Sequence, residues 1–168
     1  MLRAWEHVFE ITGPTGAQLI GLLFVVVTLG EGVSPSRADT AIRAFVTPTL
    51  VNLSSVLLQA IVALAPWPSD APAGVALVLI GLAGAAYGLV AIGLKRRAGI
   101  VELRGLNWLA YNGAPLIANA GLVFGGLGLV VPSPAAPYTI AAATTLMLAV
   151  GIFGAWDVTL WVLKTRKR

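Results

Sequence analysis

The chain has 168 residues, of which 58% are hydrophobic and 11% are charged, and its formal net charge is +4. A soluble globular domain has about 25% charged residues, so this composition excludes that class of protein. The chain has no cysteine, which excludes a disulfide framework and thiol chemistry.

Four long segments without Asp, Glu, Lys or Arg predict an all-α, polytopic membrane protein. They are 11–30, 44–69, 71–94 and 105–156. A spanning helix needs about 20 mostly apolar residues, so the first three segments each fit one helix. The fourth fits two, because prolines interrupt it at 131–137. We predict one transmembrane domain, 1–168, with helices at roughly 14–30, 48–65, 72–94, 115–131 and 137–163.

The first predicted span combines small and polar residues. Gly13, Ala17 and Gly21 recur every four residues, a spacing that lets another helix approach closely. Gln18 lies within the same run and is a candidate partner for polar residues on other spans. Glu10, near His7, is a candidate charged site, and the positive end of the helix dipole would explain an acid there equally well.

The second predicted span carries a polar stripe. Asn52, Ser55 and Gln59 fall within an arc of about 60° on a helix. Amides are costly in hydrocarbon unless they are paired, so the stripe faces protein or water. One interpretation is a hydrogen bond to Gln18 or to Asn119 of the fourth span. The other is a pore or solute path lined by Asn52, Ser55, Gln59, Asn119 and Gln18.

Segments 15–28 and 43–51 resemble a group of small bacterial inner-membrane proteins. The resemblance covers the first two predicted helices. It implies a bacterial source and an inner-membrane location, and it implies no particular activity.

The third and fourth predicted spans are rich in glycine. The small residues Gly81, Gly84 and Gly88 mark one face of the third span, and Gly121 and Gly125 mark one face of the fourth. Such faces serve ordinary packing within a bundle, or one of them serves a contact between subunits. Between these spans, segment 95–110 is amphipathic and predicts a helix lying in the membrane interface.

Asp157 is the acid that lies well inside an apolar run, in the fifth predicted span. An acid within a span is a candidate functional site. Asp157 lies only about two turns before Lys164, so a salt bridge to Arg or Lys of the neighbouring connections is the simpler interpretation.

The basic residues predict the orientation of the chain. Ten of the eleven fall on alternate connections or the C-terminal tail, and that side is expected to be cytoplasmic. They are Arg37, Arg43, Lys95, Arg96, Arg97, Arg104, Lys164, Arg166, Lys167 and Arg168. The N-terminus is therefore predicted outside and the C-terminus inside. The net positive charge reflects this rule and does not indicate a nucleic-acid partner.

No set of residues indicates catalysis, a metal site or a cofactor, and we expect no enzyme. Two classes of function remain. One is a homo-oligomeric channel for an ion or small polar solute, in which symmetry supplies the pore. The other is a non-conducting accessory or scaffold protein that binds another membrane protein through Gly and Ala faces. The sequence favours the channel.

Overall fold

The computed structural model describes residues 1–29, 46–97 and 108–166, and within them the protein is all-α. A short 3-10 helix, η1 (Leu2–Trp5), precedes the first long helix, and a π-helix, η3 (Leu109–Gly113), precedes the fourth. Five described helices are long and apolar enough to cross a membrane. They are α1 (Glu6–Leu29), α3 (Thr47–Leu64), α4 (Asp70–Arg97), α6 (Ala114–Val130) and α7 (Ala136–Arg166). The all-α class and the five candidate spans are confirmed, while orientation and insertion stay predictions.

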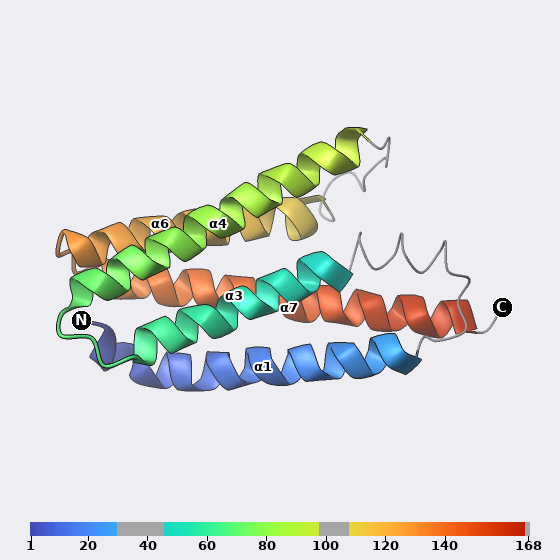
Figure 1. Ribbon diagram of the computed structural model, residues 1–168, viewed down its shortest axis with the longest axis horizontal. Helices are drawn as coiled ribbons and strands as arrows, with labels where there is room; N and C mark the ends of the chain where they lie inside the picture. Colours follow the sequence, from blue (N-terminus) through green and yellow to red (C-terminus); the bar gives the residue numbers. More distant parts are fainter. Residues whose placement is uncertain (30–45, 98–107, 167–168) are drawn as a thin grey trace.

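The helices form an up-and-down bundle (Figure 1). Helices α1, α4 and α7 run away from the N-terminal end, and α3 and α6 return to it. The turns 65–69 and 131–135 lie at that end. The helix ends that flank 30–45 and 98–107, together with the end of α7, lie at the opposite end. Arg37, Arg43 and Arg104 themselves fall outside the described residues.

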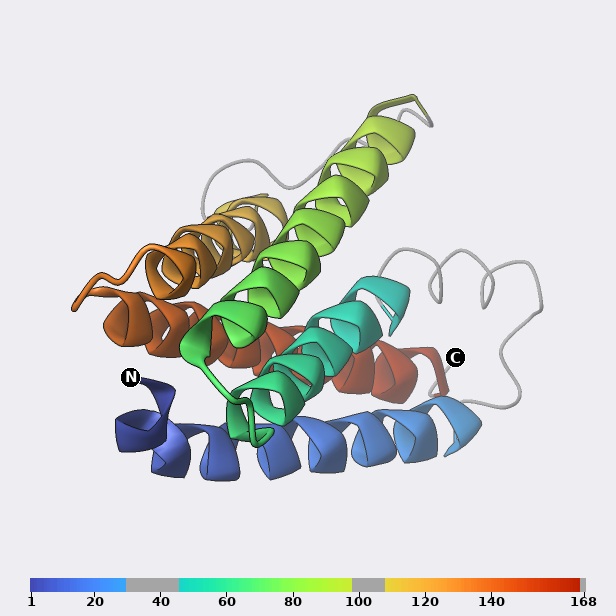
Figure 2. The same ribbon diagram turned by 60° about the vertical axis from the view of Figure 1, so that its left-hand side comes forward.

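Two helix pairs surround α7 (Figure 2). Helix α4 packs chiefly on α6, and α1 packs chiefly on α3. Helix α7 contacts α6, α1 and α3, and so joins the two pairs. The apolar core nearest the N-terminal end includes Phe9, Leu77 and Ile140, all with no exposed surface.

The first span begins earlier than predicted. Helix α1 starts at Glu6, two turns before Pro14, so this proline lies inside the helix. The additional turns are apolar on their inner side: Phe9 is fully buried, and Gly13 meets Ala60 of α3. Packing against α3 therefore extends the helix beyond the point that its proline suggested.

The other spans lie close to their predicted ranges. Helix α4 continues to Arg97, so the first three residues of the predicted interfacial segment 95–110 belong to this span. Residues 98–107 of that segment lie outside the described residues. After this segment, η3 leads directly into α6, and Pro115 lies in the first turn of α6.

The N-terminal residues cover one end of the bundle. The amino group of Met1 lies 2.7 Å from Asp70 Oδ2 at the start of α4. The ring of Trp5 meets the edge of the Tyr138 ring at the start of α7, with 4.7 Å between centroids. These contacts join the beginnings of α1, α4 and α7.

Most of the small residues expected at helix contacts pack within this single chain. A Cβ atom on Gly81 would lie 2.9 Å from the Asn119 carbonyl oxygen, and one on Gly88 would lie 3.1 Å from Leu116. Gly121 meets Ala143 of α7, and Gly125 meets Ile140 of the same helix. The glycine faces of α4 and α6, which we considered for a subunit contact, are thus covered inside the protomer.

Candidate functional site

The polar stripe of α3 reaches α7 at Gln59. This side chain is only 1% exposed. Its Nε2 atom lies 2.9 Å from Ser55 Oγ, and its Oε1 atom lies 2.7 Å from Thr144 Oγ1. The partner of Gln59 across the bundle is therefore Thr144, rather than Gln18 or Asn119.

The hydroxyl of Thr144 has a second acceptor. Thr144 Oγ1 donates to Gln59 Oε1 and also lies 2.9 Å from the Ile140 carbonyl oxygen, so two acceptors share its one proton. The Gln59 amide in turn donates through Nε2 to Ser55 Oγ. This chain of hydrogen bonds joins α3 to α7 inside the protomer.

Asn119 is a second buried amide, and it fills the crossing of α4 and α6. Its Nδ2 atom donates to the Pro115 carbonyl oxygen at 2.8 Å. Its Oδ1 atom has no hydrogen-bond partner in the described part of the chain. A Cβ atom on Gly84 would overlap the Asn119 side chain. The Cα–H of Gly84 consequently faces the amide and provides a weak donor of the kind found at helix–helix contacts.

Gln18 has the opposite environment, because it lies on the exposed side of α1. It belongs to a set of exposed residues within an arc of about 100° on this helix. We call this set the α1 stripe: His7, Glu10, Pro14, Ala17, Gln18, Gly21, Val25 and Thr28. All of them except Val25 are polar or are Gly, Ala or Pro. The bulkier Ile11, Leu22 and Phe24 border the stripe.

The α1 stripe has small residues, Ala17 and Gly21, next to Gln18. A Cβ atom added to Gly21 would have no neighbour within 4 Å, and Ala17 is exposed. These two are the members of the predicted small-residue set that do not pack inside the protomer. Among the described residues, none requires glycine at position 21, whereas Asn119 requires glycine at position 84.

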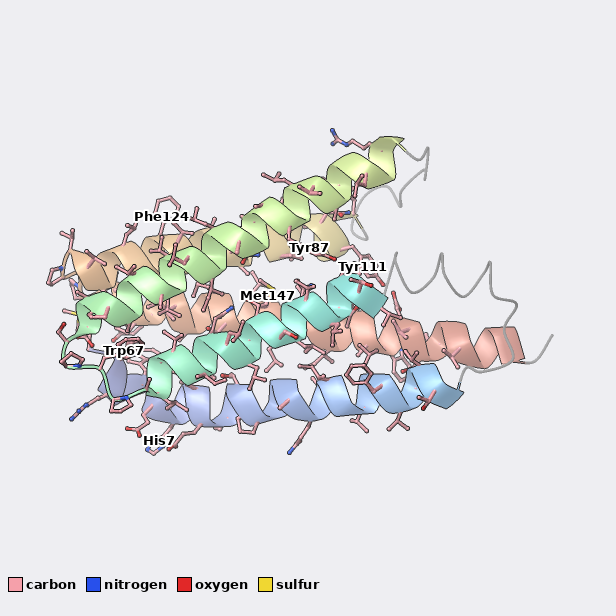
Figure 3. The ribbon with its side chains drawn as sticks, viewed as in Figure 1. His7, Trp67, Tyr87, Tyr111, Phe124 and Met147 are labelled. Atoms are coloured by element: carbon pink, nitrogen blue, oxygen red, sulfur yellow. The ribbon has the colours of Figure 1, made fainter. Side chains whose placement is uncertain are left out.

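Glu10 lies at the N-terminal end of the α1 stripe. Its Oε2 atom is 2.8 Å from His7 Nδ1, and the two side chains are 49% and 94% exposed. Figure 3 shows His7 pointing away from the other helices. Glu10 therefore places a carboxylate at the end of the stripe, outside the packed bundle.

The remaining predicted residues have less defined roles. Asn52 and Asp157 are half-buried. Arg37, Arg43 and Arg104, which were expected among the basic partners of Asp157, lie outside the described residues, so that salt bridge stays a prediction. Among the described residues, no three His, Cys, Asp or Glu side chains gather in a way that would hold a metal ion.

Sequence reasoning missed two features of this arrangement. Thr144 bonds within its own helix, and its contact with Gln59, 85 positions away, was not foreseen. The α1 stripe was also missed as a unit, although its signal is present in the sequence. Seven of its members recur at a spacing of three or four residues: His7, Glu10, Pro14, Gln18, Gly21, Val25 and Thr28.

Searches of family models, curated proteins and solved structures found no match to this chain.

Proposed function

We propose that this chain forms a homo-oligomeric membrane channel in which α1 of each copy faces the symmetry axis. The observation that carries the proposal is the α1 stripe. The outward side of a membrane helix normally contacts lipid and should be its most apolar side. On α1 an arc of about 100° of the outward side is instead polar or small except at Val25, with the apolar Ile11, Leu22 and Phe24 beside it.

Gln18 is the strongest part of this argument. It lies at the middle of α1 (Glu6–Leu29), and so at the depth of the hydrocarbon centre if α1 spans the membrane. Moving an amide without a partner into an apolar medium costs about 1–3 kcal/mol in proteins and more in pure hydrocarbon. A partner protein or water at this position removes that cost.

A second copy of the chain is a suitable partner. A glutamine amide both donates and accepts hydrogen bonds, so two copies related by symmetry can pair through the same residue. Ala17 and Gly21 flank Gln18 and permit a close approach of two backbones. Several copies arranged around an axis would surround it with the residues of the α1 stripe.

Such a ring suits an ion or a small polar solute. Gln18 and the exposed backbone at Gly21 would offer polar groups along the path, and Glu10 would place a ring of carboxylates at one mouth. Rings of acidic side chains favour cations. We accordingly expect cations to permeate better than anions.

The alternative is a non-conducting accessory protein, and the buried amides favour it. Gln59 bonds within the protomer and Asn119 is enclosed by α4. They therefore offer no polar lining to a path through one copy. In this alternative, a helix of another membrane protein covers the α1 stripe.

Single cysteines test the two functions, because the chain has none of its own. The variants are Gln18→Cys on the α1 stripe and Leu79→Cys on the outer face of α4, each purified and placed in liposomes. For a channel, Gln18→Cys cross-links between copies, reacts with a water-soluble thiol reagent and loses cation flux after reaction. Leu79→Cys does none of these.

Other results would separate the alternatives. Cross-linking of Gln18→Cys without labelling and without flux would favour a non-conducting homo-oligomer. A monomer that conducts nothing would overturn the channel and leave the accessory function.

A further inference from the structure

An apolar groove with a volume of about 220 Å³ lies between α1 and α7. It borders the α1 stripe but does not include it. Leu22 and Trp156 form its rims and are 61% and 60% exposed, whereas Leu23 is buried beneath it. Ala155 leaves the groove open, because it is small among the larger residues of α7 that line it.

We propose that this groove binds an acyl chain of an anionic phospholipid. The proposal is independent of the channel, because it concerns a different face of α1. Seven of the eight residues that line the groove are apolar, which suits a hydrocarbon chain.

The chemistry of the lining also favours a hydrocarbon chain. The polar side chain in the groove is Thr159, and its hydroxyl donates to the Ala155 carbonyl oxygen at 2.9 Å. It therefore has no proton left to donate to a ligand. A saturated chain satisfies such a site, whereas a polar ligand would lose hydrogen bonds on entering.

The charge beyond the groove indicates an anionic headgroup. The lining residues lie in the C-terminal halves of α1 and α7, which end on the same side of the bundle (Figure 1). Past the groove, α7 carries Lys164 and Arg166, and the sequence continues with Lys167 and Arg168. Basic residues next to a membrane surface attract anionic lipids.

Photolabelling of the whole protein tests this site directly. The probe is phosphatidylglycerol with a photoreactive group in its acyl chain, used in lipid nanodiscs, with labelled peptides mapped by mass spectrometry. We expect labelling of 19–26 and 152–159 to exceed that of the equally exposed outer face of α4 several-fold. Unlabelled phosphatidylglycerol should compete, and phosphatidylcholine should compete several-fold less well. Even labelling of all exposed faces, or equal competition, would overturn the proposal.

A matched pair of variants gives a second test. Ala155→Leu fills the groove, whereas Ala149→Leu adds the same side chain at an exposed position of α7. We expect Ala155→Leu to reduce labelling at the groove at least threefold and Ala149→Leu to leave it unchanged. If a neighbouring copy cross-links to the groove and excludes the lipid probe, the groove holds a helix and the proposal is wrong. The wild-type labelling decides the question should Ala155→Leu fail to fold.

Discussion

The exposed sides of α1 and α4 both face away from the bundle, yet they differ in composition. The outer face of α4 comprises Val75, Leu79, Leu82, Ala83, Ala86, Leu89 and Val90, within an arc of about 120°. Every one of these residues is apolar, and Leu79 is 61% exposed. The α1 stripe instead has an amide at mid-span, a glycine, an alanine and a proline.

On the proposed function, the two exposed faces have different surroundings. The outer face of α4 meets the requirement for contact with lipid, which is an apolar surface without unpaired polar groups. The α1 stripe does not meet it, because Gln18 would be left without a partner in hydrocarbon. Two glycines illustrate the two environments. A Cβ atom on Gly84, on the inner side of α4, would overlap Asn119, whereas a Cβ atom on Gly21, on the outer side of α1, would have no neighbour within 4 Å.

Replacing each of the two glycines by leucine should give the largest difference in stability. Gly84→Leu forces a side chain into Asn119 and should destabilise the protomer by about 3 kcal/mol or more, since overpacking a helix contact displaces both backbones. Gly21→Leu meets open space and should change protomer stability by no more than about 1 kcal/mol. Unfolding in mixed micelles, followed by circular dichroism, measures both. If Gly84→Leu unfolds like the wild type, the close crossing of α4 and α6 is wrong.

Exchanging the polarity of the two outer faces should have the second-largest effect on stability. Leu79→Gln puts an amide into lipid and should lower stability by about 1–3 kcal/mol. Gln18→Leu should leave the isolated protomer as stable as before but weaken self-association. The readouts are unfolding and the fraction of chemically cross-linked oligomer, measured on the same preparations. Equal losses of stability in both variants would mean that the two outer faces have the same surroundings.

Removing the buried amide of Gln59 should have a smaller effect on stability. This change tests whether Gln59 pairs with Thr144 inside the protomer. Gln59→Ala and Thr144→Ala, singly and together, form a double-mutant cycle. We expect a coupling energy of about 1 kcal/mol, as found for hydrogen bonds between membrane helices. Gln59→Ala should not alter cation flux, because this side chain is enclosed. A coupling energy near zero, with altered flux, would instead place Gln59 in a hydrated path.

The sequence was sufficient to predict the number and type of spans, because uninterrupted apolar runs are a one-dimensional signal. It was insufficient for the start of α1, since Pro14 is a weaker determinant than the burial of Phe9 and Gly13 against α3. It was also insufficient for the partner of Gln59. An amide can pair with any polar residue that the fold brings near, and only the packing of α3 on α7 selects Thr144.

The ion pair between the amino group of Met1 and Asp70, which joins the N-terminal residues to α4, should have the smallest effect on stability. The amino group of Met1, next to η1 and α1, pairs with Asp70 at the start of α4 at 2.7 Å, with both groups 38% exposed. Exposed ion pairs contribute about 0–1 kcal/mol, so Asp70→Asn should lower stability by less than about 1 kcal/mol, and less in high salt.

Asp70 also lies in the first turn of α4, where an acid interacts favourably with the helix dipole. Acetylation of the amino group separates the two contributions, because it removes the ion pair and leaves the dipole interaction. If the ion pair dominates, Asp70→Asn has little further effect on the acetylated protein. If Asp70→Asn costs the same with and without acetylation, the helix dipole accounts for the effect, and the N-terminal residues are held to α4 by packing alone.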